Sequence, residues 1–289
     1  MKFTKMHGIG NDYVFVNCFD ERVAKPAKIA REISDRHFGV GSDGLILICP
    51  SRKADAKMRI FNADGSEAEM CGNGIRCVAK YVYEHKLAKP GAAVSMGDRT
   101  TYPASLKIET KAGVLTIGLI LRGKTVQSAC VNMGEPVFRP KDIPVKLPGE
   151  RVVEHPVEIL GQKLFMTCVS MGNPHAVFFC DDVEAIELER LGPAIENNEL
   201  FPRRTNVHFV QVDSLAKFTM RTWERGSAIT LACGTGACAC GVAAAVIGLC
   251  NRNSTAILPG GQLQLDSSTQ DNCVYMAGPA VEVFEGIWP

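Results

Sequence analysis

The chain has 289 residues, of which 46% are hydrophobic and 22% are charged, and its formal net charge is +1 at pH 7. This composition is typical of a globular protein with a sizeable core, and the charge balance argues against a nucleic-acid-binding surface. The twelve cysteines are scattered along a chain too large to need a disulfide framework. No signal-peptide pattern is visible, so we expect reduced thiols in a cytoplasmic protein.

Short runs of β-branched and aromatic residues, bounded by turn residues, predict strands in both halves of the chain. The first half contains "YVFVNCF", "GLILIC", "KMRIFN" and "SLKIET", and the second contains "AVFFC", "VHFVQV" and "KFTMRTW". Helices are predicted near residues 28–37 and 182–191, and one after each of the motifs "CGNG" and "CGTG". Behind the first motif, Ile75, Val78, Ala79 and Val82 recur at the spacing of one helical face.

The second of these motif helices is apolar on every side. Residues 226–251 contain no charged side chain, but the helix-like part, residues 237–250, is shorter than the roughly 20 residues that a bilayer requires. Such a helix is expected to be buried inside a globular domain rather than in a membrane.

Two motifs occur twice with the same spacing. Gly-Asn followed by Val-Phe begins at Gly10 and again at Gly172, and 60 residues separate Asn11 from Cys71 and also Asn173 from Cys233. The repeat predicts two similar halves. We place them at residues 1–130 and 131–273, with residues 274–289 returning to the first half as a closing strand.

Each Cys-Gly-x-Gly motif places a cysteine at the start of a predicted helix. The first N–H groups of a helix lack internal partners and carry the positive end of its dipole. The pattern therefore predicts a lowered thiol pKa, within roughly 3.5–7.5 in strong cases. The same N–H groups can bind a carboxylate. Two such thiols, one removing a proton from a carbon and one delivering a proton to its opposite face, predict stereochemical inversion.

These motifs also have other interpretations. A cysteine before a helix is usually a packing residue, which is how we interpret Cys77, Cys238 and Cys240. A metal site built on Cys233 and its neighbours lacks a matching Cys-x-x-Cys pair. "GTGACA" matches a dinucleotide-binding pattern, but no acidic residue follows at the required distance. We therefore expect no metal and no cofactor.

The chain resembles the diaminopimelate epimerase family over nearly its whole length. The resemblance rests on "KMHGIGNDYVFV", "FNADGSEAEMCGNGIRC", "SMGNPHAVFF", "RRTNVHFV" and "ERGSAITLACGTGACA", in that order. It implies cofactor-independent interconversion of LL- and meso-2,6-diaminopimelate, a small-molecule step in lysine and peptidoglycan precursor synthesis. It also implies an α+β fold of two pseudo-symmetric domains, each a β-barrel-like mixed sheet around a central helix, and a homodimer.

The resemblance further implies roles for individual residues. Cys71 and Cys233 match the two acid/base cysteines, and His175 and Glu224 match residues that tune them. The substrate-binding positions are Asn11, Asn62, Gly72, Asn73, Asn173, Asn206, Glu224, Arg225, Gly234 and Thr235. The side-chain chemistry is suitable, because an arginine fork binds a carboxylate and a carboxylate binds an ammonium group.

Each of these positions also has a structural interpretation. A single asparagine is commonly a turn residue, and Asn62 precedes the turn-forming "ADGS". Arg225 and Glu224 are the residue types of a surface ion pair, and His175 of a hydrogen-bonded structural histidine. Gly44 stands where some family members carry Gln, so no side-chain contact is expected there. Extra residues around "SMGDRTTYPA" and "KLPGERVVEH" are expected to form surface loops.

Two alternative functions remain open at this point. One is a racemase or epimerase of another amino acid in the same superfamily. The other is a thiol redox switch that uses Cys71 and Cys233, whose thiols can form a disulfide if the fold brings them close together.

Overall fold

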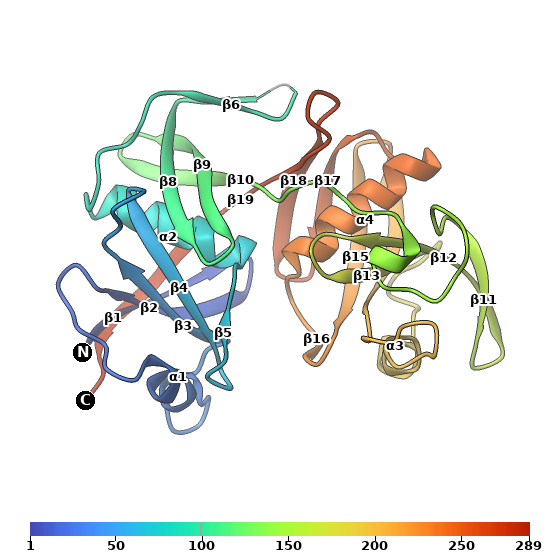
Figure 1. Cartoon of the computed structure of the whole chain (residues 1–289), viewed down its shortest axis with the longest axis horizontal. Helices are drawn as coiled ribbons and strands as arrows, with labels where there is room; N and C mark the ends of the chain where they lie inside the picture. Colours follow the sequence, from blue (N-terminus) through green and yellow to red (C-terminus); the bar gives the residue numbers. More distant parts are fainter. Residues whose placement is uncertain (99) are drawn as a thin grey trace. The chain divides into compact units, whose positions relative to one another are not determined.

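The computed structural model describes residues 1–98 and 100–289. Their contacts divide the chain into two compact units, residues 1–132 with 277–289 and residues 133–276 (Figure 1). Unit 1 contains the helices α1 (Pro26–Ser34) and α2 (Gly72–Glu84) and the strands β1 (Lys2–Gly8), β2 (Asn11–Asn17), β3 (Gly44–Cys49), β4 (Ala56–Asn62), β5 (Glu67–Ala68), β6 (Val94–Met96), β7 (Thr100–Tyr102), β8 (Ala104–Thr110), β9 (Gly113–Arg122), β10 (Thr125–Asn132) and β20 (Val281–Ile287).

Unit 2 has a similar content of helices and strands. It contains a short 3₁₀ helix (Pro140–Asp142), the helices α3 (Leu188–Glu196) and α4 (Gly234–Ile247), and the strands β11 (His155–Ile159), β12 (Gln162–Ser170), β13 (Pro174–Phe179), β14 (Asn206–Ser214), β15 (Lys217–Glu224), β16 (Ala228–Ile229), β17 (Asn253–Leu258) and β18 (Gly261–Ser267). Strand β19 (Val274–Gly278) leads from unit 2 back into unit 1.

The two units share one strand order. In unit 1, β1 is antiparallel to β2, β2 parallel to β3, β3 antiparallel to β4, β4 parallel to β8, and β8 antiparallel to β9. In unit 2 the strands β12, β13, β14, β15, β17 and β18 repeat this alternation. Strand β20 adds to unit 1 by pairing antiparallel with β1.

The register of the central strands is repeated as well. Val14 pairs with Leu45 in unit 1, and the residues 162 positions later, Ala176 and Val207, pair in unit 2. The pairing of Phe61 with Glu67 recurs in the same way between β15 and β16. The expected α+β fold of two similar halves is therefore confirmed.

A long helix lies against the strands of each unit. Helix α2 contacts β1, β2, β4, β8 and β10, and helix α4 contacts β12, β13, β14, β17 and β18 (Figure 1). Most of α4 between Gly236 and Ala244 is buried, as its apolar sequence predicts. No helix in the described part of the chain is long and apolar enough to cross a membrane.

The side chains of β3 show why this strand is apolar on both faces. Leu45 and Leu47 belong to a cluster that includes Ala30 and Ile33 of α1. Ile46 points the other way, because a Cβ built on Gly74 of α2 would lie 2.7 Å from its Cδ1. Alternate residues of a strand face opposite sides, so one face of β3 packs against α1 and the other against α2.

The helix predicted at residues 182–191 begins later, at Leu188. The preceding segment uses its polar backbone groups elsewhere: the N–H of Val183 donates to Gln211, and Arg221 donates to the carbonyls of Val183 and Ile186. These contacts bridge distant strands and hold the segment in a turn conformation. The first helix also ends early, at Ser34, where Asp35 accepts two following N–H groups.

The two expected surface loops are more ordered than the sequence suggested. Around "SMGDRTTYPA", β6 and β7 form a hairpin whose Met96 and Tyr102 are buried against Gly118 of β9. Arg99 of this segment lies outside the described residues. In the second segment Val152 is buried in the core of unit 2.

Candidate active site

Cys71 caps the N-terminus of α2. Its backbone is extended (φ −142°, ψ 118°), and the N–H of Gly74 donates to its Sγ at 3.4 Å. A side chain on Gly74 would collide with Ile46, so this glycine lets the helix end approach β3 closely. The "CGNG" pattern therefore has a packing reason as well as a chemical one.

The Cys71 thiol is hydrogen-bonded to Asn11, which is in turn hydrogen-bonded to Asn73. The thiol donates to Oδ1 of Asn11 at 3.6 Å, and the same oxygen accepts from Nδ2 of Asn73 at 3.3 Å. Asn73 is itself oriented by the fully buried Arg76, whose Nη2 donates to its Oδ1 at 2.9 Å. The predicted residues Asn11, Asn73 and Cys71 are thus brought together in unit 1.

The side chain of Asn11 is held by Asp43, which forms an acidic pair with Asp12. Its Nδ2 donates to Asp43 at 2.7 Å, and Arg36 donates to Asp43 at 2.9 Å and to Asp12 at 3.0 Å. Burial opposes the ionisation of Asp12, but Lys5 and Arg36 lower its pKa overall, whereas burial and the neighbouring Asp12 raise the pKa of Asp43. These charges fix which way the Asn11 amide points.

Tyr13 is a residue that the sequence interpretation missed. It is 7% exposed, and it is close enough to the Cys71 thiol to lower the pKa of that thiol, while its own pKa is raised by burial and by the charge of Cys71. The internal repeat could have revealed it, because Tyr13 lies 162 residues before His175. Unit 1 therefore presents a phenol where unit 2 presents an imidazole.

Cys233 is the N-cap residue of α4 and has the same extended backbone (φ −119°, ψ 101°), but unlike Cys71 its side chain makes no capping hydrogen bond. It is 3% exposed, and its Sγ lies 3.7 Å from Oγ1 of Thr235. A Cβ on Gly236 would lie 2.3 Å from Cε1 of His208 and 2.9 Å from Sγ of Cys233. The last glycine of "CGTG" thus allows an imidazole to pack directly under the helix N-terminus.

Further predicted residues of unit 2 gather beside Cys233. Asn173 donates from Nδ2 to Thr235 at 3.3 Å, and its Oδ1 lies 2.9 Å from Nε2 of His175. The Glu224 carboxylate, whose charge raises the pKa of the Cys233 thiol, accepts from the hydroxyl of Thr230 at 2.6 Å. Asn173, His175 and Thr235 therefore form one hydrogen-bonded group with this thiol, the Cys233 group, and Glu224 acts on the same thiol through its charge.

Asn206 and Arg225 form a separate contact at the edge of this group. The buried Asn206 accepts from the backbone N–H of Arg225 at 3.0 Å and donates to the carbonyl of Pro174 at 2.8 Å. The exposed guanidinium of Arg225 donates to the carbonyl of Arg203 at 3.1 Å. Asn206 thus positions the backbone that carries Arg225, which leaves most of the arginine fork directed to solvent.

The prediction of lowered cysteine pKa values is wrong. Burial raises the pKa of the Cys71 thiol above its usual 9.0, although the N–H groups of Gly74 and Asn73 act against the increase. Burial and the Glu224 carboxylate raise the pKa of Cys233 well above 9.0. Loss of hydration outweighs the helix terminus, because removing an anion from water is costly and a terminus offers only partial charges.

Gly44 and Asn62 lie opposite each other on β3 and β4. A Cβ on Gly44 would lie 2.1 Å from the carbonyl oxygen of Phe61 and 3.0 Å from Tyr13, so a larger residue does not fit this backbone. The ring of Tyr13 occupies the space next to Gly44 that a larger side chain at this position would need. Asn62 donates to Ser66 in its own turn at 3.0 Å, in agreement with its structural interpretation.

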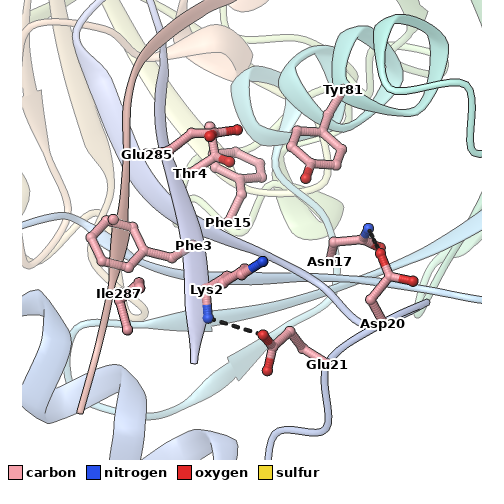
Figure 2. A pocket seen from close by; sticks show the side chains of 11 residues that line it. Lys2, Phe3, Thr4, Phe15, Asn17, Asp20, Glu21, Tyr81, Glu285 and Ile287 are labelled. Carbon is pink, nitrogen blue, oxygen red and sulfur yellow. Dashed lines mark hydrogen bonds between the residues drawn. The ribbon is translucent and has the colours of Figure 1, made fainter.

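A pocket of about 660 Å³ opens elsewhere in unit 1, between β1, β2, β20 and α2 (Figure 2). Lys2 and Glu21 are hydrogen-bonded at its mouth, and so are Asn17 and Asp20. Its described lining includes none of the predicted site residues. The chemistry-bearing residues gather instead at the N-termini of α2 and α4, and no group of three or more potential metal ligands occurs among the residues described.

The fold is shared with a solved PhzF-family phenazine biosynthesis protein from Bacillus anthracis. The two agree with a TM-score of 0.71 at 20% identity, over 100% of this chain and 99% of that one. The likeness defines the class as α+β proteins built from two repeated halves.

Sequence comparison identifies the family within that class. The model of the diaminopimelate epimerase family matches residues 3–139 and 167–283. Proteins named diaminopimelate epimerase are 52% identical in Agathobacter rectalis, over 99% of this chain and 98% of the relative, and 49% identical in Acetivibrio thermocellus, with the same coverage. The chain belongs to the diaminopimelate epimerase family, which is a family of isomerases.

Proposed function

We propose that the protein interconverts LL- and meso-2,6-diaminopimelate by moving the α-proton between two cysteines. The observation that carries the proposal is the placement of Cys71 and Cys233 at equivalent N-cap positions of a repeated fold, in a chain about half identical to proteins named for this reaction. The proposal includes a cytoplasmic location, a role in lysine and peptidoglycan precursor synthesis, and a homodimeric state.

The chemistry begins with one cysteine as thiolate and the other as thiol. The thiolate removes the α-proton, and the thiol delivers its proton to the opposite face of the same carbon, so the configuration inverts and the two sulfur atoms exchange roles. Because both pKa values are raised, few thiolates exist near neutral pH, but each is a strong base once formed. The negative charge of Glu224 raises the pKa of the Cys233 thiol and so favours its protonated form.

The reacting carboxylate is proposed to bind the free N–H groups at the two helix starts. Gly72 and Asn73 would supply them at α2, and Gly234 and Thr235 at α4. N–H groups aligned in advance stabilise the negative charge that develops beside the carboxylate when the proton leaves. This preorganisation takes the place of an electron-withdrawing cofactor in the proposed reaction.

The distal amino-acid end needs one anion-binding and one cation-binding group. The guanidinium of Arg225 is exposed and can bind the distal carboxylate through its paired donors. Asn62, Asn173, Asn206 and Glu224 complete the proposed set. A smaller substrate such as proline has no distal end for these residues to bind, which favours diaminopimelate over the alternative amino acids.

Deuterium incorporation provides the test. Reduced protein is incubated with LL-diaminopimelate in deuterated water, and α-carbon deuterium is followed together with formation of the meso isomer. We expect incorporation with inversion. Incorporation only with another amino acid would refute the substrate assignment, and no exchange with any amino acid would favour the thiol-switch alternative. The Cys180→Ala protein is the matched control, since Cys180 is a partly buried thiol of unit 2 at the end of β13.

A further inference from the structure

His208 is a buried histidine that the proposed reaction does not use. It is 0% exposed on β14, and its ring lies under the N-terminus of α4 against Gly236. Its Nδ1 lies 2.9 Å from Oγ1 of Thr222 and its Nε2 lies 2.9 Å from Nδ1 of His175. Both ring nitrogens are therefore engaged, and one of them contacts a residue of the Cys233 group.

The donor and acceptor at each contact follow from Asn173. Its amide nitrogen donates to Thr235, so its oxygen faces His175 at 2.9 Å and can only accept. Nε2 of His175 must then carry a proton. Burial, with His208 and Arg225 nearby, lowers the pKa of His175 well below 6.5, so the ring is neutral and its Nδ1 is an acceptor.

The same logic continues to the far end. Since Nδ1 of His175 accepts, Nε2 of His208 must donate to it. Burial lowers the pKa of His208 to about 3, so this ring is also neutral, and its Nδ1 accepts from the hydroxyl of Thr222. Thr222 is 3% exposed, which removes competition from bulk water.

The contacts join into one directed chain. Thr222 donates to His208, His208 to His175, His175 to Asn173, and Asn173 to Thr235. Thr235 accepts from Asn173, so its own proton is left for Sγ of Cys233, 3.7 Å away. With the opposite polarity, Thr235 would have to donate to Asn173 and could not donate to the sulfur.

We propose that His208 is a positioning residue that sets the polarity of this hydrogen-bond chain, so that the Thr235 hydroxyl donates to Cys233. The proposal rests on the proposed function in that Cys233 is taken as a catalytic thiol. His208 itself moves no proton in the reaction. Its role is to hold His175 in one tautomer, and through Asn173 and Thr235 to supply a donor whenever the sulfur is an anion.

Unit 1 offers a natural comparison. The position equivalent to His208 is Ile46, which packs against Gly74 as His208 packs against Gly236. An isoleucine cannot relay a hydrogen bond, so the chain exists in the Cys233 group alone. Cys71 therefore serves as an internal reference in any measurement on the variants.

The first experiment measures the tautomers of the wild-type protein by ¹⁵N NMR at neutral pH. We expect His175 and His208 both to be neutral and protonated at Nε2. Protonation at Nδ1 of either ring would reverse or break the chain and overturn the proposal. This measurement needs no variant, so it stands even if a substitution prevents folding.

The second experiment compares His208→Leu, which has no donor, with His208→Gln, whose amide nitrogen can replace Nε2. Alkylation of Cys233 and Cys71 is followed by mass spectrometry as a function of pH. We expect His208→Leu to raise the midpoint for Cys233 by about one pH unit and lower kcat about tenfold, since one donor to an anion is weakened. Cys71 should not change, His208→Gln should restore most of the effect, and Thr222→Val should shift Cys233 in the same direction.

The charge of Glu224 raises the pKa of Cys233, and the charge of Arg225 lowers the pKa of His175. Neither residue is changed in any of these variants, so both effects are the same in each protein compared. Unchanged Cys233 alkylation in His208→Leu, with KM and thermal stability also unchanged, would refute the positioning role. Equal shifts at Cys71 and Cys233 would indicate a general loss of structure and would refute it too. Retained epimerisation by Cys233→Ala would instead refute the proposed function itself.

Discussion

Tyr13 and His175 occupy the same position of the repeated fold, each two residues after an asparagine, and His175 is hydrogen-bonded to its asparagine, Asn173. Both side chains are buried, at 7% and 0% exposure. Tyr13 itself lowers the pKa of the Cys71 thiol, whereas His175 is linked to Cys233 through Asn173 and Thr235. The repeat therefore supports its two thiols by different means, and their responses to mutation should differ.

Tyr13→Phe removes the phenolic hydroxyl that lowers the pKa of Cys71 and keeps the ring that lies beside Gly44. We expect kcat to fall about tenfold and the pKa of Cys71 to rise, because a hydrogen bond to a charged group is worth roughly 1.5–3 kcal/mol. Kinetics and pH-dependent alkylation of Cys71 measure both effects. Tyr81→Phe is the matched control, since Tyr81 is equally buried at 7% exposure in the same unit. Equal losses in both proteins would contradict a specific role for Tyr13.

Substitution of either proposed acid/base cysteine by alanine should abolish epimerisation. Each variant lacks the group that accepts or delivers a proton on one face, and such groups contribute roughly 10²–10⁴-fold to rate. Conversion of LL- to meso-diaminopimelate by Cys71→Ala and Cys233→Ala is measured beside Cys180→Ala, which should stay active. Turnover near the wild-type rate in either alanine variant would exclude the two-base assignment.

The pH dependence of kcat/KM tests whether the pKa values of the two thiols are raised, as burial implies, or lowered, as the motif predicts. Burial raises both pKa values above 9.0, so the thiolate fraction grows throughout the range below that pH. We expect kcat/KM to increase steadily from pH 7 to pH 9 without a plateau. A profile that levels off below about pH 7.5 would instead match the lowered pKa values typical of exposed helix N-termini.

Acid should destabilise the fold before the carboxylates titrate. His175 and His208 are neutral in the folded state, His208 with a pKa of about 3, while an unfolded histidine has a pKa of about 6.5. Below that value the unfolded chain binds more protons, so the free energy of unfolding falls as pH decreases.

The slope is up to about 1.4 kcal/mol per pH unit for each histidine well below pH 6.5. Urea unfolding between pH 6.5 and pH 5 measures this slope, and His208→Gln should reduce it by the contribution of one histidine. A slope that is the same in both proteins would show that His208 does not stay neutral on folding.

A thiol outside the proposed site should react first with alkylating reagents. The neighbouring Cys18, together with Arg59 and Lys57, lowers the pKa of Cys49 to about 7. Brief iodoacetamide treatment at pH 7 should label Cys49 ahead of Cys71 and Cys233, as read by mass spectrometry. Cys18→Ala should slow this reaction, since the largest contribution to the lowered pKa of Cys49 is removed. Faster labelling of Cys71 would contradict the assigned order of thiolate stability.

The sequence by itself determined the repeated architecture and the positions of the two helix-capping cysteines. These are local features: strand patterns are read over a few residues, and each Cys-Gly-x-Gly motif of this chain stands at the start of a helix. The equal spacing from Asn11 to Cys71 and from Asn173 to Cys233 extended this local information to the whole fold. The family followed from the same motifs.

Tertiary structure decided the chemistry around those cysteines. Burial reversed the expected direction of both thiol pKa values, because hydration depends on every neighbour and not on the motif alone. Strand register brought Tyr13 to Cys71 and placed His208 beneath α4, although neither residue stands near its cysteine in sequence. The polarity of the chain that ends at Cys233 is likewise a property of the folded protein, since each donor is assigned only by the partner that packing supplies.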